Sequence, residues 1–395
     1  MSAEQRRTLS PSSAYRFVVI IGITSLFADM TYEGARSITG PFLQTLGASA
    51  AVVGFTAGFG ELVGYALRSV AGFIGDRTGR YWLMAIFGYA VNMLTVPALA
   101  LSGNWQAAAA LIVGERTGRA VRKPVTEAML SFAAREVGAG QTYGIVEFLD
   151  QLGATAGPLI VAFVLFLQFS YQAGFALLLA PAVLTIVTLL GARMAYPDPR
   201  SLEPARSIGV ERFSKPYWLY MAAGGCVAAG FTDFALIAYH FEKTHSVASG
   251  LIPVFYAAAM AMGAISALAL GRLFDRLGVT VVIVALLLSS FFAPFVFLGR
   301  GWGALIGMIL WGIGMGAQES LLKSLIVGFI PSARRATAFG VFDTCFGIAW
   351  FAGSWLMGAL YDVSLIGLIG FSVLCQLASL PLFLLSERRG QRTPA

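Results

Sequence analysis

The chain has 395 residues, of which 57% are hydrophobic and only 12% are charged. An average soluble protein is about 25% charged, so this composition excludes an ordinary water-soluble domain and predicts a protein of the lipid bilayer. The net charge of +7 does not indicate a nucleic-acid partner, because the basic residues are spread singly among apolar runs. Cys226, Cys345 and Cys375 lie in apolar segments without paired spacing, so we expect neither a disulfide nor a metal site.

Twelve apolar segments follow one another along the chain, each near or above the about 20 residues that a membrane-spanning helix needs. They cover residues 16–38, 48–72, 80–101, 105–130, 141–167, 171–194, 216–240, 247–271, 278–299, 302–329, 337–361 and 364–386. The longest polar stretch, residues 196–215, falls after the sixth segment. We therefore expect an all-α membrane protein with a six-helix bundle in residues 1–195, a cytoplasmic linker in residues 196–215 and a second six-helix bundle in residues 216–395. The polar N-terminal stretch has no small-residue cleavage site, so we expect the first span to be retained.

Lysine and arginine residues are distributed unequally between the two sets of loops. Twenty of the 27 fall on the side that would hold both termini, and three, Arg36, Lys243 and Arg300, fall on the other side. Cytoplasmic loops of membrane proteins carry an excess of these residues. We therefore expect both termini in the cytoplasm and the protein in the inner (plasma) membrane.

The two halves of the chain repeat each other. The pattern G-x3-D-R-x-G occupies residues 72–79 and recurs at residues 271–278, 199 positions later. Gly157 corresponds to Gly353 at an offset of 196, and Asp233 in the seventh span falls where Asp29 lies in the first. Such a repeat predicts two pseudo-symmetric bundles with a central site between them.

The segment from Leu111 to Pro158 carries charged residues between apolar flanks. A charged side chain inside the hydrocarbon is costly, so such residues normally pair and face a cavity. Glu115, Arg119 and Arg122 share one helical face, and we expect Glu115 and Arg119 to form an ion pair.

The loops after the second and eighth spans carry a recognisable motif. GFIGDRTGR, residues 72–80, resembles the signature of the major facilitator superfamily, and GRLFDRLG, residues 271–278, resembles its second copy. The resemblance covers nearly the whole chain, and it implies that Asp76 latches the two halves together on the cytoplasmic side when the carrier opens outward. A carboxylate there would face the positive N-terminal end of the eleventh helix, near Ala336. The alternative is that Asp76 and Arg80 only shape a tight loop.

The fifth span indicates the direction of transport. Its glycines at positions 144, 153 and 157, followed by Pro158, resemble the motif of the drug:proton antiporters of this superfamily, although Val161 and Ala162 replace the usual final glycine pair. Glycines at this spacing also allow close helix packing. In the fourth span Arg116 lies near the family's arginine, but Gly118 follows it after two residues rather than four. Together with the loop motifs, this pattern gives the predicted gating residues Gly72, Asp76, Arg77, Arg80, Asp275, Arg276, Gly153, Gly157 and Pro158.

Ten of the twenty carboxylates lie in the predicted spans. Burial favours the neutral form of a carboxyl group and an adjacent guanidinium favours the charged form, so such groups can exchange protons near neutral pH. Asp29, Glu33 and Arg36 share one face of the first span, and Arg36 is the one obvious local partner of the two acids. Coupling or substrate binding is the favoured role of Asp29 and Glu33, and pairing of both with Arg36 is the structural alternative. The candidate proton-coupling residues are Asp29, Glu33, Glu147, Asp150, Asp233 and Asp343. The candidate substrate-binding residues are Tyr32, Arg36, Glu115, Arg116, Arg119, Gln151, Glu319 and Lys323. Structural ion pairs are the alternative, above all for Glu115 with Arg119 and for Glu319 with Lys323.

These features together predict a proton-coupled secondary transporter working by alternating access, which exports a small cationic or zwitterionic solute or drug by proton antiport. The alternatives are a proton symporter that takes up an organic acid or sugar-like metabolite, and a non-transporting membrane receptor on the same fold. No nucleophile–base pair, metal cluster or phosphate-binding glycine loop supports an enzyme or an ATP-driven pump. We expect a monomer in the lipid bilayer that binds protons and a small molecule, with no cofactor and no nucleic-acid partner.

Overall fold

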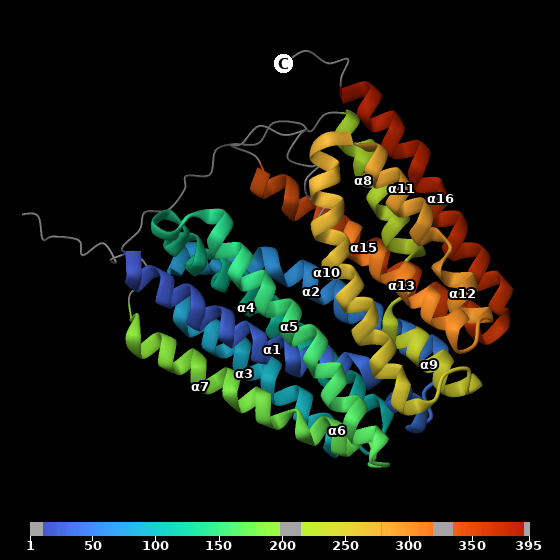
Figure 1. The fold of residues 1–395 in the computed structure, drawn as a ribbon, viewed down its shortest axis with the longest axis horizontal. Helices are drawn as coiled ribbons and strands as arrows, with labels where there is room; N and C mark the ends of the chain where they lie inside the picture. The colour runs from blue at the N-terminus through green and yellow to red at the C-terminus, as the bar shows by residue number, and fades with distance from the viewer. Residues whose placement is uncertain (1–10, 198–214, 278, 319–334, 391–395) are drawn as a thin grey trace, which may run out of the picture.

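The computed structural model describes residues 11–197, 215–277, 279–318 and 335–390, and the described residues are helices joined by short turns (Figure 1). Ten of the described helical segments are long and apolar enough to cross a membrane. The chain is therefore an all-helical, multi-pass membrane protein, as its composition predicts.

The helices of the first 195 residues follow the predicted spans closely. They are α1 (Pro11–Thr45), α2 (Ala50–Thr78), α3 (Tyr81–Ala98), α4 (Trp105–Val137), α5 (Ala139–Phe166), α6 (Tyr171–Leu177) and α7 (Leu179–Ala195). Short polar side chains begin several of them, because the first N–H groups of a helix need acceptors. The Ser49 hydroxyl accepts from the Val52 N–H at 3.3 Å, and the Asn104 carboxamide accepts from the Ala107 N–H at 2.8 Å.

The helices after residue 214 are interrupted more often. They are α8 (Lys215–Gly230), α9 (Phe234–Thr244), α10 (Ile252–Leu277), α11 (Val279–Ser290), α12 (Phe292–Leu298), α13 (Trp302–Ala317), α15 (Arg335–Val363) and α16 (Leu365–Gly390). Each matches all or part of a predicted span. The end of the tenth predicted span, at residues 319–329, and most of the predicted linker lie outside the described residues.

Two helix pairs with equivalent roles pack backbone against backbone. A Cβ atom added at Gly157 of α5 would lie 2.1 Å from the Met30 carbonyl oxygen of α1, and one added at Gly353 of α15 would lie 2.1 Å from the Ala229 carbonyl oxygen of α8. Only glycine allows helices to approach this closely. The glycine match found in the sequence therefore corresponds to two matching helix contacts, α1 with α5 and α8 with α15.

Residues 11–195 and the residues after 214 contact each other strongly at one end of the molecule. We call the end with Thr45, Phe166 and Val363 the distal end, and the opposite end, where α1 begins and α16 ends, the terminal end; in Figure 1 the distal end lies at the lower right.

Contacts at the distal end run along α1 with α9 and along α2 with α15. A Cβ at Gly40 of α1 would collide with the Ala235 carbonyl, and one at Gly54 of α2 would collide with the Ser354 carbonyl. The Asp362 carboxylate, at the end of α15, accepts a hydrogen bond from the Ala51 N–H in the first turn of α2 at 3.1 Å. The distal end is therefore closed.

The α1–α5 contact leads to a first prediction. Replacing Gly157 by alanine forces the Met30 backbone away and should destabilise the protein by about 1–3 kcal/mol, the usual cost of overpacking. Gly144→Ala, in the same helix, is the matched control. A Cβ there meets nothing within 4 Å, so the exchange should be neutral or stabilising by about 0.5–1 kcal/mol. Thermal melting in detergent measures both variants, and equal melting temperatures would contradict the close contact.

Candidate functional site

A break in the seventh span brings a carboxylate into the centre of the protein. Helix α8 ends at Gly230 and α9 starts at Phe234, and the Asp233 side chain caps α9 by accepting from the Ala235 N–H at 3.0 Å. The carbonyl groups freed by the break find partners on other helices. Trp311 Nε1 donates to the Thr232 carbonyl at 2.9 Å, and the Ser372 hydroxyl donates to the Gly230 carbonyl at 2.6 Å. Backbone groups that lie outside a helix at membrane depth need hydrogen-bond partners. These partners are present at the break, so the break is a stable part of the fold.

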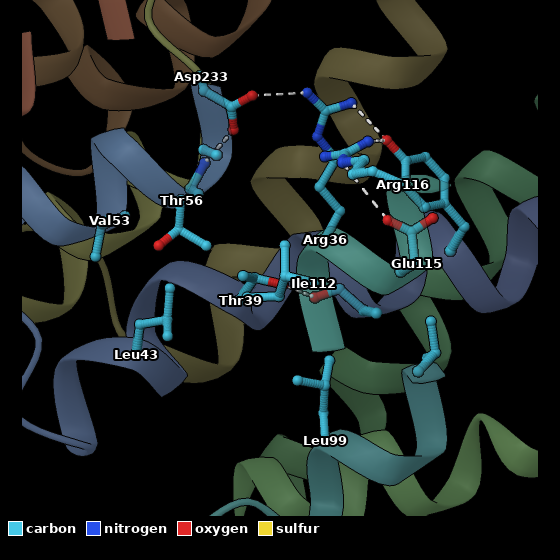
Figure 2. Close-up of a pocket in the computed structure, with 15 residues that line it drawn as sticks. Arg36, Thr39, Leu43, Val53, Thr56, Leu99, Ile112, Glu115, Arg116 and Asp233 are labelled. Atoms are coloured by element: carbon cyan, nitrogen blue, oxygen red, sulfur yellow. Dashed lines mark hydrogen bonds and ion pairs between the residues drawn. The ribbon is translucent and has the colours of Figure 1, made fainter. Parts of the chain in front are cut away.

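The Asp233 carboxylate forms an ion pair with the first segment of the chain. Its Oδ2 atom lies 3.1 Å from Arg36 NH2 of α1, and both side chains are buried, at 2% and 8% exposure. Glu61 of α2 joins this pair to a second arginine, because its Oε1 atom lies 3.7 Å from Arg36 NH2 and 3.1 Å from Arg116 NH1 of α4. Figure 2 shows the Arg36 and Arg116 side chains next to each other between Asp233 and Glu115.

The ion pair of Glu115 differs from the expected one. Its Oε2 atom lies 3.5 Å from Arg116 Nε, and its Oε1 atom accepts from Asn92 Nδ2 of α3 at 2.6 Å. Arg119 is not its partner: the Arg119 guanidinium carbon lies 4.1 Å from the ring centroid of Tyr32 instead. The predicted Glu115–Arg119 ion pair is not formed: the two are electrostatic neighbours, but Glu115 pairs with the adjacent Arg116 of the same helix and with Asn92 of α3.

The helix α1 acids also have other partners than Arg36. Asp29 Oδ1 lies 3.3 Å from Arg122 NH2 of α4, and the Tyr256 hydroxyl of α10 donates to Glu33 Oε2 at 2.5 Å. Asp29 therefore pairs with Arg122 rather than Arg36, whereas Glu33 keeps Arg36 as an electrostatic neighbour beside its hydrogen bond to Tyr256.

A phenol links the arginines of the site. The Tyr32 hydroxyl accepts from Arg36 NH1 at 3.2 Å and also from Arg116 NH1. The guanidinium groups of Arg116 and Arg119 lie over its ring. We call the nine charged residues around it the central cluster: Asp29, Glu33, Arg36, Glu61, Glu115, Arg116, Arg119, Arg122 and Asp233.

Two cavities adjoin the central cluster on opposite sides. Toward the distal end, a cavity of about 30 Å³ lies between Thr39, Leu43, Val53 and Asp233 and has room for about two water molecules. Toward the terminal end, a cavity of about 400 Å³ is lined by residues of α1, α3, α4 and α5. Its polar and charged lining residues are Ser25, Asp29, Tyr89, Arg119, Arg122, Lys123, Thr126, Glu127, Tyr143, Glu147 and Asp150.

The remaining predicted site residues that the structure describes take no part in the ion pairs of the central cluster. Gln151 Nε2 donates to Glu147 Oε1 at 2.9 Å on α5, and Asp343 of α15 has Tyr217 of α8 as an electrostatic neighbour. Gly153 and Gly157 pack against α1, and α5 continues as a helix through Pro158. In the loop motif α2 ends at Gly79, which has a left-handed φ of 56°, between Arg77 and Arg80.

Several predictions fall outside the described part of the chain. Glu319 and Lys323 belong to residues 319–334, and the side chains of Asp76, Asp275 and Arg276 are also outside the described set. The latch and the Glu319–Lys323 pair therefore stay predictions.

Three residues of the site had no role assigned from the sequence. Glu61 is one of the ten carboxylates in the predicted spans, and an ionisable residue inside a span is a functional candidate in itself. Asn92 and Tyr256 gave no such signal, because a single amide or phenol in an apolar helix is common. Only their contacts with Glu115 and Glu33 identify them.

The correspondence between Asp233 and Asp29 is also corrected by the helix contacts. Because Gly157 packs on Met30 and Gly353 packs on Ala229, α1 aligns with α8 at an offset of 199, from residue 30 to residue 229. Asp233 then corresponds to Gly34. The Asp233 carboxylate has no acidic counterpart in α1.

Comparisons with known proteins agree with this architecture. Residues 21–354 match the family model described as Major Facilitator Superfamily. An uncharacterized protein of Mycobacterium tuberculosis is 38% identical over 376 residues, which cover 93% of this chain and 92% of that protein. An uncharacterized MFS-type transporter of Methanocaldococcus jannaschii is 24% identical and covers 88% of this chain and 89% of its own.

Solved structures of transporters share the fold. A crystal structure of the peptide transporter POT in complex with sulfate has a TM-score of 0.76 at 15% identity, covering 95% of this chain and 94% of that chain. A mutant of the nucleoside transporter NupG has a TM-score of 0.75 at 13% identity, covering 93% of this chain and 100% of that chain. The family model over residues 21–354 shows that the chain belongs to the major facilitator superfamily, as a multi-pass membrane transporter rather than an enzyme.

Proposed function

We propose that this protein is a proton-coupled antiporter that exports a small cationic or zwitterionic solute by alternating access. The observation that carries the proposal is the Arg36–Asp233 ion pair, which joins α1 to the break before α9 next to two cavities of very different size. A buried ion pair between two moving parts holds one conformation and is released when one partner is neutralised.

The moving parts in this proposal are the two six-helix bundles, residues 1–195 and 216–395. The matching contacts of α1 with α5 and of α8 with α15 support such a repeat. The excess of lysine and arginine near the terminal end supports cytoplasmic termini. With this orientation, the closed distal end faces outward and the cavity of about 400 Å³ faces the cytoplasm, from which an exporter takes its substrate.

Proton coupling in this proposal depends on the charge balance of the central cluster. The cluster holds five carboxylates and four guanidinium groups, so one acid has no matching cation. Glu33 is the candidate, because its hydrogen bond goes to the Tyr256 phenol while Asp29, Glu61, Glu115 and Asp233 all form ion pairs with arginine. Its other charged neighbours are Arg36, Arg119 and Asp29. A proton on Glu33 would balance the cluster, and its loss would change the contact between α1 and α10.

The direct test is transport. Inverted vesicles containing the protein should accumulate a substrate from a panel of cationic and zwitterionic compounds when the vesicle interior is made acidic. Accumulation should stop when a protonophore abolishes the gradient. Vesicles without the protein are the control. Accumulation driven equally well without any pH gradient would contradict proton antiport.

The Arg36–Asp233 pair leads to a conformational prediction. Asp233→Asn removes the charge that holds Arg36 at the distal end, and the loss of one partner of a buried pair costs about 3–5 kcal/mol. If the substitution destabilises the distal-closed state by about 3 kcal/mol relative to the distal-open state, the distal-open population should rise about a hundredfold.

Labelling of Leu43→Cys by an impermeant maleimide from the distal side reports this shift, in a background where Cys226, Cys345 and Cys375 are replaced. Glu115→Gln is the matched control, because Glu115 pairs within the first bundle. Labelling that rises equally in both variants would show general loosening rather than release of a closure.

The coupling role of Glu33 gives a separate prediction. Glu33→Gln keeps a hydrogen-bonding partner for Tyr256 but cannot exchange a proton. We expect it to lose accumulation driven by a pH gradient and to keep substrate counterflow, which needs no net proton movement. Both are measured in proteoliposomes beside Glu136→Gln, an exposed acid at the end of α4. Gradient-driven transport that survives in Glu33→Gln would move the coupling site elsewhere.

A further inference from the structure

We propose that the cavity of about 400 Å³ binds a small organic zwitterion, with its carboxylate on Arg119 and its ammonium group on Asp150. This inference rests on the proposed transport function and names the class of its substrate. The cavity lies between α1, α3, α4 and α5 on the terminal side of the central cluster.

Arg119 is the cationic end of this site. In the described structure Arg36, Arg116 and Arg122 all form ion pairs with carboxylates, whereas Arg119 has no ion pair and no hydrogen bond there. Its guanidinium lies over the ring of Tyr32 and lines the cavity. A guanidinium offers paired N–H donors that match a carboxylate. Arg119 has the cluster carboxylates as electrostatic neighbours but no direct ion-pair partner in the described structure, so its N–H donors can take an anionic group from the cavity.

Asp150 is the anionic end. Its Oδ1 atom is buried without a hydrogen-bond partner in the described structure, although the residue lines the cavity. The nearby Glu147 accepts from Gln151, and Asp29 is held by Arg122. A buried acceptor without a partner is costly, so an ammonium group placed there removes that cost. Lys123, which also lines the cavity, is an electrostatic neighbour of Asp150.

Both ends lie on one cavity that carries charges of both signs, which favours a zwitterion over a ligand with a single charge. An anion would satisfy Arg119 but would meet Asp150, Glu147 and Glu127 in the same space. A cation would satisfy these acids but would leave Arg119 without a partner. A zwitterion satisfies both, and the apolar side chains of Val146 and Leu130 with the rings of Tyr89 and Tyr143 provide contacts for its carbon skeleton.

The test uses the purified full-length protein and the ω-amino carboxylates from glycine to 6-aminohexanoate. Each is compared with the alkylamine and the alkyl carboxylate of the same chain length. Binding is measured by thermal shift in detergent. At least one zwitterion should bind more tightly than both of its single-charge counterparts, because each charged group adds a charge-assisted hydrogen bond.

Two variants separate the ends of the site. Arg119→Gln should weaken the binding of the best zwitterion about ten- to hundredfold and leave the binding of the matching alkylamine unchanged. Asp150→Asn should weaken the binding of this zwitterion by a similar factor and leave the binding of the matching alkyl carboxylate unchanged. Arg119→Lys keeps the positive charge and shows whether a loss of binding in Arg119→Gln comes from misfolding. Glu136→Gln is the control outside the cavity. The inference is overturned if no zwitterion exceeds its counterparts, or if both variants bind it as the wild type does.

Transport assays with the same compounds distinguish failure of the zwitterion-site inference from failure of the proposed transport function. If a pH gradient drives a simple amine but no zwitterion binds, proton antiport stands and the zwitterion site falls. If the zwitterion binds as expected and no gradient moves any compound, the site stands and the transport proposal falls.

Discussion

The ion pair between Arg36 and Asp233 is the contact on which the centre of the molecule depends. Both groups are buried, so each needs an opposite charge to remain ionised at this depth, and the pair supplies the shortest such contact for both. The pair also determines local structure. Asp233 can reach Arg36 because α8 stops and α9 starts at this point, and the backbone of the break is held by Trp311 and Ser372. One charge pair therefore links a helix break, an interface and the closure of the distal end.

Much of the fold could be predicted from the sequence, because the preference of each residue for lipid or water is local information. Every predicted span overlaps a described helix, and the match between Gly157 and Gly353 appears as two equivalent backbone contacts. The break at residues 231–233 could not be predicted in the same way. It is stabilised by partners on α13 and α16, which are far away in the sequence.

The sequence predicted most residues of the site but not which of them pair with each other. Spacing along α4 suggested the pair Glu115–Arg119, yet Glu115 pairs with the adjacent Arg116 and accepts from Asn92 of α3. Arg36 was the obvious local partner of Asp29 on α1, yet Asp29 pairs with Arg122 of α4. Spacing along one helix gives only the candidates that this helix offers. In a bundle, each buried charge also meets side chains from two or three neighbouring helices, and Glu61, Asn92 and Tyr256 entered the site by that route.

The contact of Asp362 with the start of α2 has a consequence for the surroundings of the protein. The carboxylate is solvent-exposed and faces the positive end of a helix. Attraction between an exposed charge and a helix end is screened by dissolved ions, with a Debye length of about 10 Å at 0.1 M salt and about 3 Å at 1 M. The buried Arg36–Asp233 pair is shielded from those ions. Ionic strength at the distal face thus loosens the outermost contact between α2 and α15 while leaving the inner Arg36–Asp233 pair intact, so the closure has one layer that responds to salt and one that does not.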